Sequence, residues 1–186
     1  MKIIQKEVKD FAKKPIVDIE ISNDIRGPNG GAWKYINSNV IVVGTFYENK
    51  ITQFILKENK ESFINKVVEH LINLSKEGEL YCLNERMERE GLFNLTNKIF
   101  PFKDVRKSIV PGSSKERLFS FLIKAKKLEP ITDPFNGDGY MCILKYKEYE
   151  KTKDESFLLE IATHNQNCLL KENQIFKHRG FLSKFF

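Results

Sequence analysis

The chain has 186 residues, of which 41% are hydrophobic and 30% are charged, so a single domain spanning 1–186 can bury its own core. No apolar run approaches the ~18 residues of a membrane-spanning helix, so we expect no membrane partner. The charged stretch at 1–9 lacks the apolar segment of a signal peptide, and Cys82, Cys142 and Cys168 have no CxxC spacing. We therefore expect a cytoplasmic protein without a disulfide framework or a zinc cage.

The net charge of +6 is concentrated in one segment, since nine basic and three acidic residues lie between positions 97 and 130. Such a segment predicts contact with nucleic acid, because each neutralised phosphate releases condensed counterions. A solvated surface, or one that docks an acidic protein partner, is the alternative interpretation. The side chains expected to contact phosphates or to stack on bases of single-stranded DNA or RNA are Arg106, Lys107, Lys124, Lys126, Lys127 and Trp33.

The first part of the chain is predicted to form strands. Residues 16–21 alternate apolar and acidic side chains, residues 39–46 form a continuous apolar run, and residues 51–56 follow a turn at 48–50. We expect three strands, of which the last two form a hairpin. The glycine-rich connection at 23–31 matches neither a dinucleotide-binding fingerprint nor the GxxxxGK[ST] pattern of a P-loop.

Helices dominate the second part of the chain, with a short strand expected at 79–83 and an irregular stretch at 130–139. Apolar periodicity predicts helices at 61–75, 85–92, about 114–127, 140–149 and 155–176. Ser113 or Ser114 is expected to cap the third of these helices, and Asp154 the last. Strands mainly first and helices mainly last predict one α/β or α+β domain, with a mixed sheet flanked by helices.

Asp18 and Glu20 are the first candidate functional residues. They lie two positions apart on a predicted strand, so the pleat directs both carboxylates to the same side of the sheet. Two carboxylates in this arrangement can hold a hard cation such as Mg²⁺, which prefers oxygen ligands. The alternative is a half-exposed strand with one solvated face.

Several short motifs follow one another along nearly the whole chain. They are the DxE strand at 16–21 with the apolar run at 40–45, LNERMEREGL at 83–92, the basic region at 102–129, the segment 137–149, and HNQNC at 164–168. This succession resembles the RNase H-like predicted exonucleases of the YprB-like branch of the DEDD superfamily. The resemblance implies an RNase H-like α/β domain whose mixed sheet begins with antiparallel strands.

The resemblance also implies 3′–5′ exonucleolytic cleavage of DNA or RNA, by hydrolysis with two Mg²⁺ or Mn²⁺ ions. On this alignment Asp18, Glu20 and Glu88 are metal ligands, and Met87 replaces the usual aromatic residue. His164 would orient or deprotonate the attacking water, a role that suits an imidazole.

The chain departs from the family at the last acidic motif. The position of the final Asp is taken by Cys168 or, if an Asp-Cys variant of the motif is aligned, by Asn167. Neither side chain is a carboxylate, although an Asn can still offer a carbonyl oxygen to a metal. The nearest acids on the same predicted helix are Glu160 and Glu172. The alternative is therefore a catalytically degenerate domain that binds nucleic acid or a protein partner without turnover.

Overall fold

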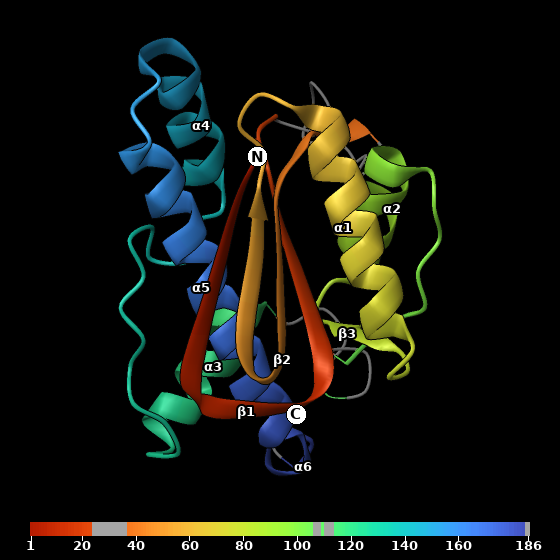
Figure 1. Cartoon of the computed structure of the whole chain (residues 1–186). Helices are drawn as coiled ribbons and strands as arrows, with labels where there is room; N and C mark the ends of the chain where they lie inside the picture. Colours follow the sequence, from red (N-terminus) through yellow and green to blue (C-terminus); the bar gives the residue numbers. More distant parts are fainter. Residues whose placement is uncertain (24–36, 106–108, 110–113, 185–186) are drawn as a thin grey trace.

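A computed structural model describes residues 1–23, 37–105, 109 and 114–184. These residues form a four-stranded sheet with the order β2-β1-β3-β4, in which β2 is antiparallel to β1, β3 is parallel to β1, and β4 is parallel to β3. The strands are β1 (Lys2–Ile21), β2 (Val40–Ile55), β3 (Leu80–Cys82) and β4 (Phe102–Asp104). The predicted α/β class and mixed sheet are confirmed, and the arrangement is consistent with an RNase H-like fold (Figure 1).

β2 doubles back on itself. Its backbone turns at Glu48, where φ is 54°, and the N–H of Leu56 donates to the carbonyl of Ile41 at 2.8 Å. Figure 1 shows this narrow loop of strand lying inside the wider bend of β1. The hairpin predicted from the apolar runs at 39–46 and 51–56 is therefore confirmed.

β1 is longer than the sequence predicts. It begins at Lys2, whereas the alternation of side chains indicated a strand only at 16–21. The additional arm carries mostly exposed side chains and pairs with the second half of β2, with Lys2 opposite Ile55. Ile4 and Val8 of this arm pack partly against the core, whereas Ile3 and Phe11 are exposed, so its apolar residues do not follow a clear period of two.

Two short parallel strands complete the sheet. Ile16 of β1 lies opposite Tyr81 of β3, and Leu80 of β3 lies opposite Phe102 of β4. The sequence predicted β3 but not β4, since no strand or helix was predicted between the helix at 85–92 and the one at about 114–127. A strand of three residues is too short to show a period of two.

Helices cover both faces of the sheet (Figure 1). They are α1 (Lys60–Ser75), α2 (Glu85–Thr96), α3 (Lys115–Lys124), α4 (Tyr140–Thr152), α5 (Ser156–Lys177) and α6 (Arg179–Leu182). As predicted, the Ser114 side chain caps α3 by accepting the N–H of Arg117 at 3.2 Å. The N-cap position of α5 is Glu155 and not the predicted Asp154, whose side chain accepts the N–H of Ser156 at 2.8 Å. None of these described helices has both the length and the apolar character that crossing a lipid bilayer requires.

The side chains of β1 divide between the two faces of the sheet. Val17 and Ile19 pack in an apolar core with residues of α1 and α2, whereas Asp18 and Glu20 accept hydrogen bonds from Asn165 of α5. The predicted common side of the two carboxylates is thus the side covered by α5. The candidate site lies in the interface between this helix and the sheet.

His70 of α1 lies against β2. Its Nε2 is 2.8 Å from Oγ1 of Thr45, and its ring centroid is 5.0 Å from that of Phe54. Burial, together with the positive charge of Lys50, lowers the pKa of His70 from 6.5 to about 4. As the pH falls, the unfolded chain therefore protonates this imidazole before the folded chain does.

We predict that the contribution of neutral His70 to stability is complete above pH 6.5 and is lost as the pH falls to about 4. The loss reaches roughly 1 to 2 kcal/mol at about pH 5. Urea unfolding of the wild type and of His70→Gln, at about pH 7.5 and about pH 5, measures it. On going from the higher to the lower pH, the free energy of unfolding of the wild type should fall by this amount relative to that of His70→Gln. A difference that does not change with pH would contradict the prediction.

Candidate active site

Four buried carboxylates meet between β1, α2 and α5, and we call them the acid cluster. They are Asp18 and Glu20 of β1, Glu88 of α2 and Glu172 of α5, with exposed fractions of 6%, 6%, 2% and 1%. The charge of Asp18 acts on each of the other three. Burial first, and repulsion from Asp18 second, raise the pKa of Glu20 and of Glu88 well above the ordinary value.

Lys115, the first residue of α3, places its ammonium inside the acid cluster. Its Nζ lies 3.2 Å from Oδ1 of Asp18 and 3.3 Å from Oε1 of Glu172. Burial alone would lower the pKa of this ammonium, but Asp18, Cys168 and Glu172 around it raise that pKa well above its ordinary value. For Glu172, burial raises the pKa and Lys115 opposes the rise. One ammonium does not balance four carboxylates, so the cluster favours uptake of protons or of a cation.

Asn165 of α5 holds the two carboxylates of β1 in place. Its Nδ2 donates to Oδ2 of Asp18 at 2.8 Å and to Oε1 of Glu20 at 3.4 Å. Nε2 of Gln53 donates to Oδ1 of Asn165 at 2.9 Å, which orients the amide so that its NH₂ group faces the acids. Asn165 can approach because Gly44 has no side chain: a Cβ there would lie 1.9 Å from Oδ1 of Asn165.

His164 is oriented by a carboxylate that the sequence did not single out. Its Nδ1 is 2.8 Å from Oδ1 of Asp133, which also accepts the N–H of Phe135, while Oδ2 of Asp133 accepts from Lys171. Burial opposes ionisation of Asp133, but these hydrogen bonds outweigh it and lower the pKa of the carboxyl group. When Asp133 accepts the Nδ1 proton, Nε2 is the ring nitrogen without a proton, and it lies 3.9 Å from Oε1 of Glu20.

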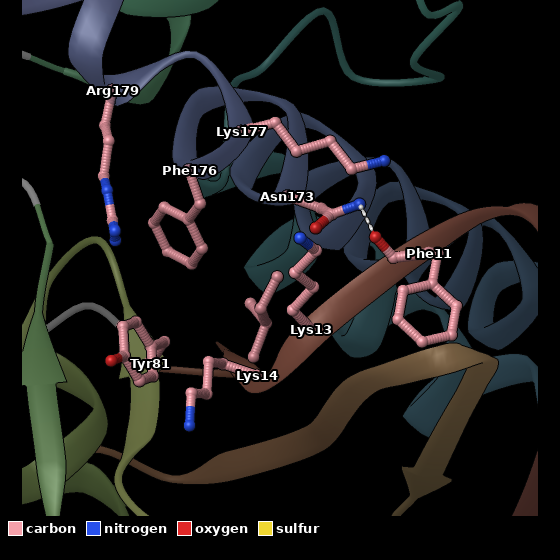
Figure 2. A pocket seen from close by; sticks show the side chains of 9 residues that line it. Phe11, Lys13, Lys14, Tyr81, Asn173, Phe176, Lys177 and Arg179 are labelled. Atoms are coloured by element: carbon pink, nitrogen blue, oxygen red, sulfur yellow. Dashed lines mark hydrogen bonds between the residues drawn. The ribbon is translucent and has the colours of Figure 1, made fainter.

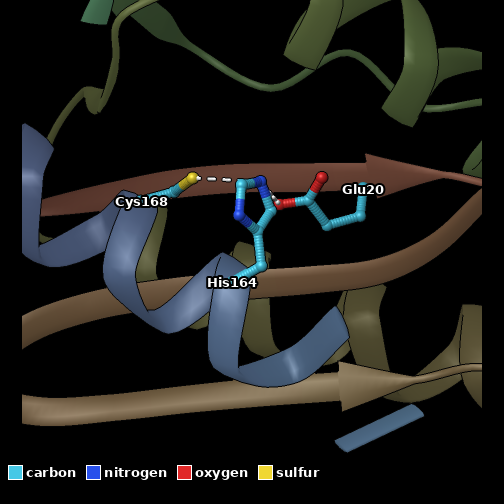
Figure 3. Close-up of side chains that lie close together, drawn as sticks. All are labelled: Glu20, His164 and Cys168. Carbon is cyan, nitrogen blue, oxygen red and sulfur yellow. Dashed lines mark hydrogen bonds and ion pairs between the residues drawn. The ribbon is translucent and has the colours of Figure 1, made fainter. Parts of the chain in front are cut away.

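Glu20, His164 and Cys168 form the part of the site with the geometry of a metal centre (Figure 3). One ligand atom from each of them lies within 4.8 Å of the other two, and Sγ of Cys168 is 3.6 Å from Nε2 of His164. Sγ of Cys142 donates to the other oxygen of Glu20 at 3.4 Å. Burial raises the pKa of the Cys168 thiol well above its ordinary value, so a metal ligated there would have to displace its proton.

Two carboxylate oxygens of the acid cluster have no hydrogen-bond partner among the described residues. They are Oε2 of Glu88 and Oε2 of Glu172, and both are buried. A buried polar atom without a partner costs free energy, so a proton or a cation bound at these oxygens would stabilise the folded state. Oxygen, imidazole and thiol donors are the groups that bind divalent transition metals. Among the described residues, the group whose donor atoms all lie within 4.8 Å of one another is Glu20, His164 and Cys168, and this group fits a divalent cation.

The structure brings together the four residues that the resemblance assigned to catalysis. Asp18, Glu20 and Glu88 belong to the acid cluster, and His164 directs Nε2 towards it. Of the two positions considered for the absent Asp, Cys168 lies in the site. Asn167 is turned away, because its Nδ2 donates to the carbonyl of Thr132 at 2.7 Å.

From the sequence, Glu172 was considered only as one of two acids near the last motif, and Lys115, Asn165 and Asp133 were not expected in the site. Glu172 carried a signal that could have found it, because His164, Cys168 and Glu172 recur every four residues and so share one face of α5. The other acid considered, Glu160, is half-exposed and pairs with Lys145 at 2.6 Å.

The basic segment at 97–130 does not form one uniform cationic surface. Lys115 turns into the acid cluster, and Lys103 pairs with Glu79 at 3.1 Å. An exposed group lies at the C-terminal end of α3, about 13 Å along the helix from Lys115. This group consists of Lys124, Lys126 and Lys127. The remaining residues predicted to bind nucleic acid lie outside the described part of the chain; they are Trp33, Arg106 and Lys107.

Comparisons of this chain with protein-family models, with curated proteins and with solved structures found no match.

We predict that Gly44→Ala destabilises the protein by about 1 to 3 kcal/mol, because the new methyl group overlaps Asn165 and forces it away from Asp18. Gly139→Ala is the matched control, since a Cβ at Gly139 meets no atom within 4 Å. The control should change stability by less than about 0.5 kcal/mol. Chemical denaturation of the wild type and of the two variants measures these changes. Equal stabilities of the three proteins would show that the packing of α5 does not depend on the absence of a side chain at Gly44.

Proposed function

We propose that this protein is a divalent-metal-dependent nuclease that hydrolyses phosphodiester bonds in DNA or RNA. The 3′–5′ direction of cleavage is the expectation from the sequence resemblance. The observation that carries the proposal is the acid cluster, with its two unpartnered carboxylate oxygens, beside an imidazole whose Nε2 lies 3.9 Å from Oε1 of Glu20 and 3.6 Å from Sγ of Cys168. Clustered carboxylates next to a general base are the arrangement that metal-assisted hydrolysis of phosphodiesters uses.

By the resemblance, Asp18, Glu20 and Glu88 would hold divalent ions, and Sγ of Cys168 lies within 4.8 Å of a carboxylate oxygen of Glu20. His164 is kept for proton transfer and is not one of these ligands. When bound, such ions supply positive charge that stabilises the phosphate oxygens and makes the attacking water more acidic. A thiol beside the carboxylates favours Mn²⁺ over Mg²⁺, which prefers oxygen ligands alone.

The chain's own residues have separable roles in this proposal. Asn165 fixes the carboxylates of Asp18 and Glu20, and Asp133 fixes the tautomer and direction of His164. As the water oxygen bonds to phosphorus, Nε2 of His164 accepts its proton. The bond from phosphorus to the 3′ oxygen of the preceding nucleotide breaks, and that oxygen takes a proton from solvent.

A second candidate function is binding of nucleic acid or of a protein without hydrolysis. The contact of Lys115 with Asp18 and Glu172 favours it, because an ammonium already provides part of the charge that a metal would provide. The neutral Cys168 at the position of the expected carboxylate favours it as well. In this candidate the acid cluster is a buried ion-pair network.

We predict that Mn²⁺ raises the melting temperature of the protein, because a cation that binds the folded state alone stabilises it by mass action. A metal concentration about 100 times the dissociation constant adds about 2.7 kcal/mol. The increment should be lost in Asp18→Asn and kept in Glu160→Gln, which removes an acid of α5 outside the cluster. A wild type whose melting temperature is the same with EDTA and with Mn²⁺ would exclude a tight metal site.

We predict that Glu172→Gln and Asp18→Asn each reduce Mn²⁺-dependent cleavage of an end-labelled oligonucleotide by about a hundredfold or more. Glu160→Gln, on the same helix, should retain wild-type cleavage, because its side chain lies away from the cluster. Cys168→Asp should increase cleavage by restoring the expected carboxylate.

Gel analysis of the products gives both the rate and the direction of cleavage. If neither the wild type nor Cys168→Asp cleaves above the level of Asp18→Asn, while single strands still bind, the nuclease proposal is wrong and the binding function stands.

A further inference from the structure

A cavity of about 400 Å³ opens at the bend of β1, between this strand, β3 and the C-terminal end of α5. Figure 2 shows the side chains around it. We call it the basic pocket, because basic and aromatic residues make up most of its lining. They include Lys13, Lys14, Lys177, Arg179, Tyr81 and Phe176.

The positive charge of the basic pocket is largely unneutralised. Lys13, Lys14 and Arg179 are exposed, and no carboxylate of the described residues forms an ion pair with them. Lys177 differs, because it pairs with Asp10. Three free cations around one cavity attract a polyanion more strongly than the same charges scattered over a surface.

The aromatic residues provide flat surfaces in the same cavity. The rings of Tyr81 and Phe176 are half-buried, with their centroids 6.1 Å apart and their planes inclined at 62°. Proteins bind single-stranded nucleic acid by combining cations, which follow the phosphates, with aromatic rings, on which bases stack. The basic pocket has both features.

The basic pocket is adjacent to the acid cluster. Ile16, which lines the pocket, precedes Asp18 by two residues on the same side of β1, a distance of about 7 Å along the strand. Phe176 follows Glu172 by one turn on the same face of α5. The basic pocket and the acid cluster are therefore neighbours along both β1 and α5.

We propose that the basic pocket binds single-stranded nucleic acid, with phosphates at Lys13, Lys14 and Arg179 and a base stacked on Tyr81 or Phe176. This deepens the proposed function by naming where the substrate strand is held. The proposal rests on that function only for the hydrolysis of the bound strand, because binding itself requires neither a metal nor cleavage. An acidic polypeptide is the competing occupant, since it shares the negative charge but has no bases.

Fluorescence anisotropy with labelled oligo(dT) and oligo(U), in EDTA so that nothing is cleaved, tests the proposal. Lys14→Gln combined with Arg179→Gln should weaken binding about tenfold and reduce the salt slope by about 1.4, about 0.7 for each lost phosphate contact. The control combines Lys66→Gln with Lys147→Gln, which removes equal charge from exposed positions of α1 and α4. It should weaken binding by less than about threefold.

The aromatic contribution is tested separately with Phe176→Leu and Tyr81→Leu. At least one of them should weaken binding about tenfold while leaving the salt slope unchanged, since stacking releases no counterions. Circular dichroism establishes that each variant is folded. If one aromatic variant unfolds, the other aromatic variant still tests stacking. The variant with Lys14→Gln and Arg179→Gln, which changes exposed side chains, still tests binding of phosphates at the pocket.

Three results would overturn the proposal. The first is equal loss of affinity in the pocket variant and in the control. The second is a larger loss in Lys124→Gln combined with Lys126→Gln, which would assign binding to the end of α3. The third is displacement of the oligonucleotide by poly-glutamate as effectively as by unlabelled oligonucleotide. Absence of cleavage with binding at the pocket retained would refute the nuclease proposal and leave this one standing.

Discussion

The burial of four carboxylates around one ammonium is the constraint on which the arrangement of this protein depends. Charged groups lose hydration when they are buried, and like charges placed together repel, so such a site needs groups that hold it in place. Lys115 of α3 and Asn165 of α5 both contact Asp18 of β1 and thereby tie three elements together at one point. Burial first, and the charge of Asp18 second, raise the pKa of Glu20 and of Glu88.

Close packing of α5 on the sheet makes this junction possible. Asn165 reaches the acids of β1 because Gly44 leaves room for it. The same helix presents His164, Cys168 and Glu172 at intervals of four residues, so an imidazole, a thiol and a carboxylate lie in a row along one face. The two candidate functions differ in what balances the acid cluster: divalent ions in the nuclease, and the Lys115 ammonium with bound protons in the binding domain.

The acid cluster and the basic pocket are opposite in charge and adjacent in space. A phosphodiester chain is attracted by the free cations of Lys13, Lys14 and Arg179 but repelled by uncompensated carboxylates. A cation in the acid cluster would remove that repulsion, so occupancy of one site favours occupancy of the other. The buried position of Lys115 reduces the repulsion already, because its ammonium lies within 3.3 Å of Asp18 and of Glu172.

Local periodicity in the sequence was sufficient to identify the main strands and helices and to place Asp18 and Glu20 on one side of the sheet. These features depend on residues that are near neighbours along the chain. Local periodicity did not reveal that Glu172 completes the acid cluster or that the Lys115 ammonium lies inside it. Lys115 contacts Asp18 across 97 positions and Glu172 across 57. Such contacts were decided by the tertiary structure, because the environment of a buried charge depends on which distant elements pack around it.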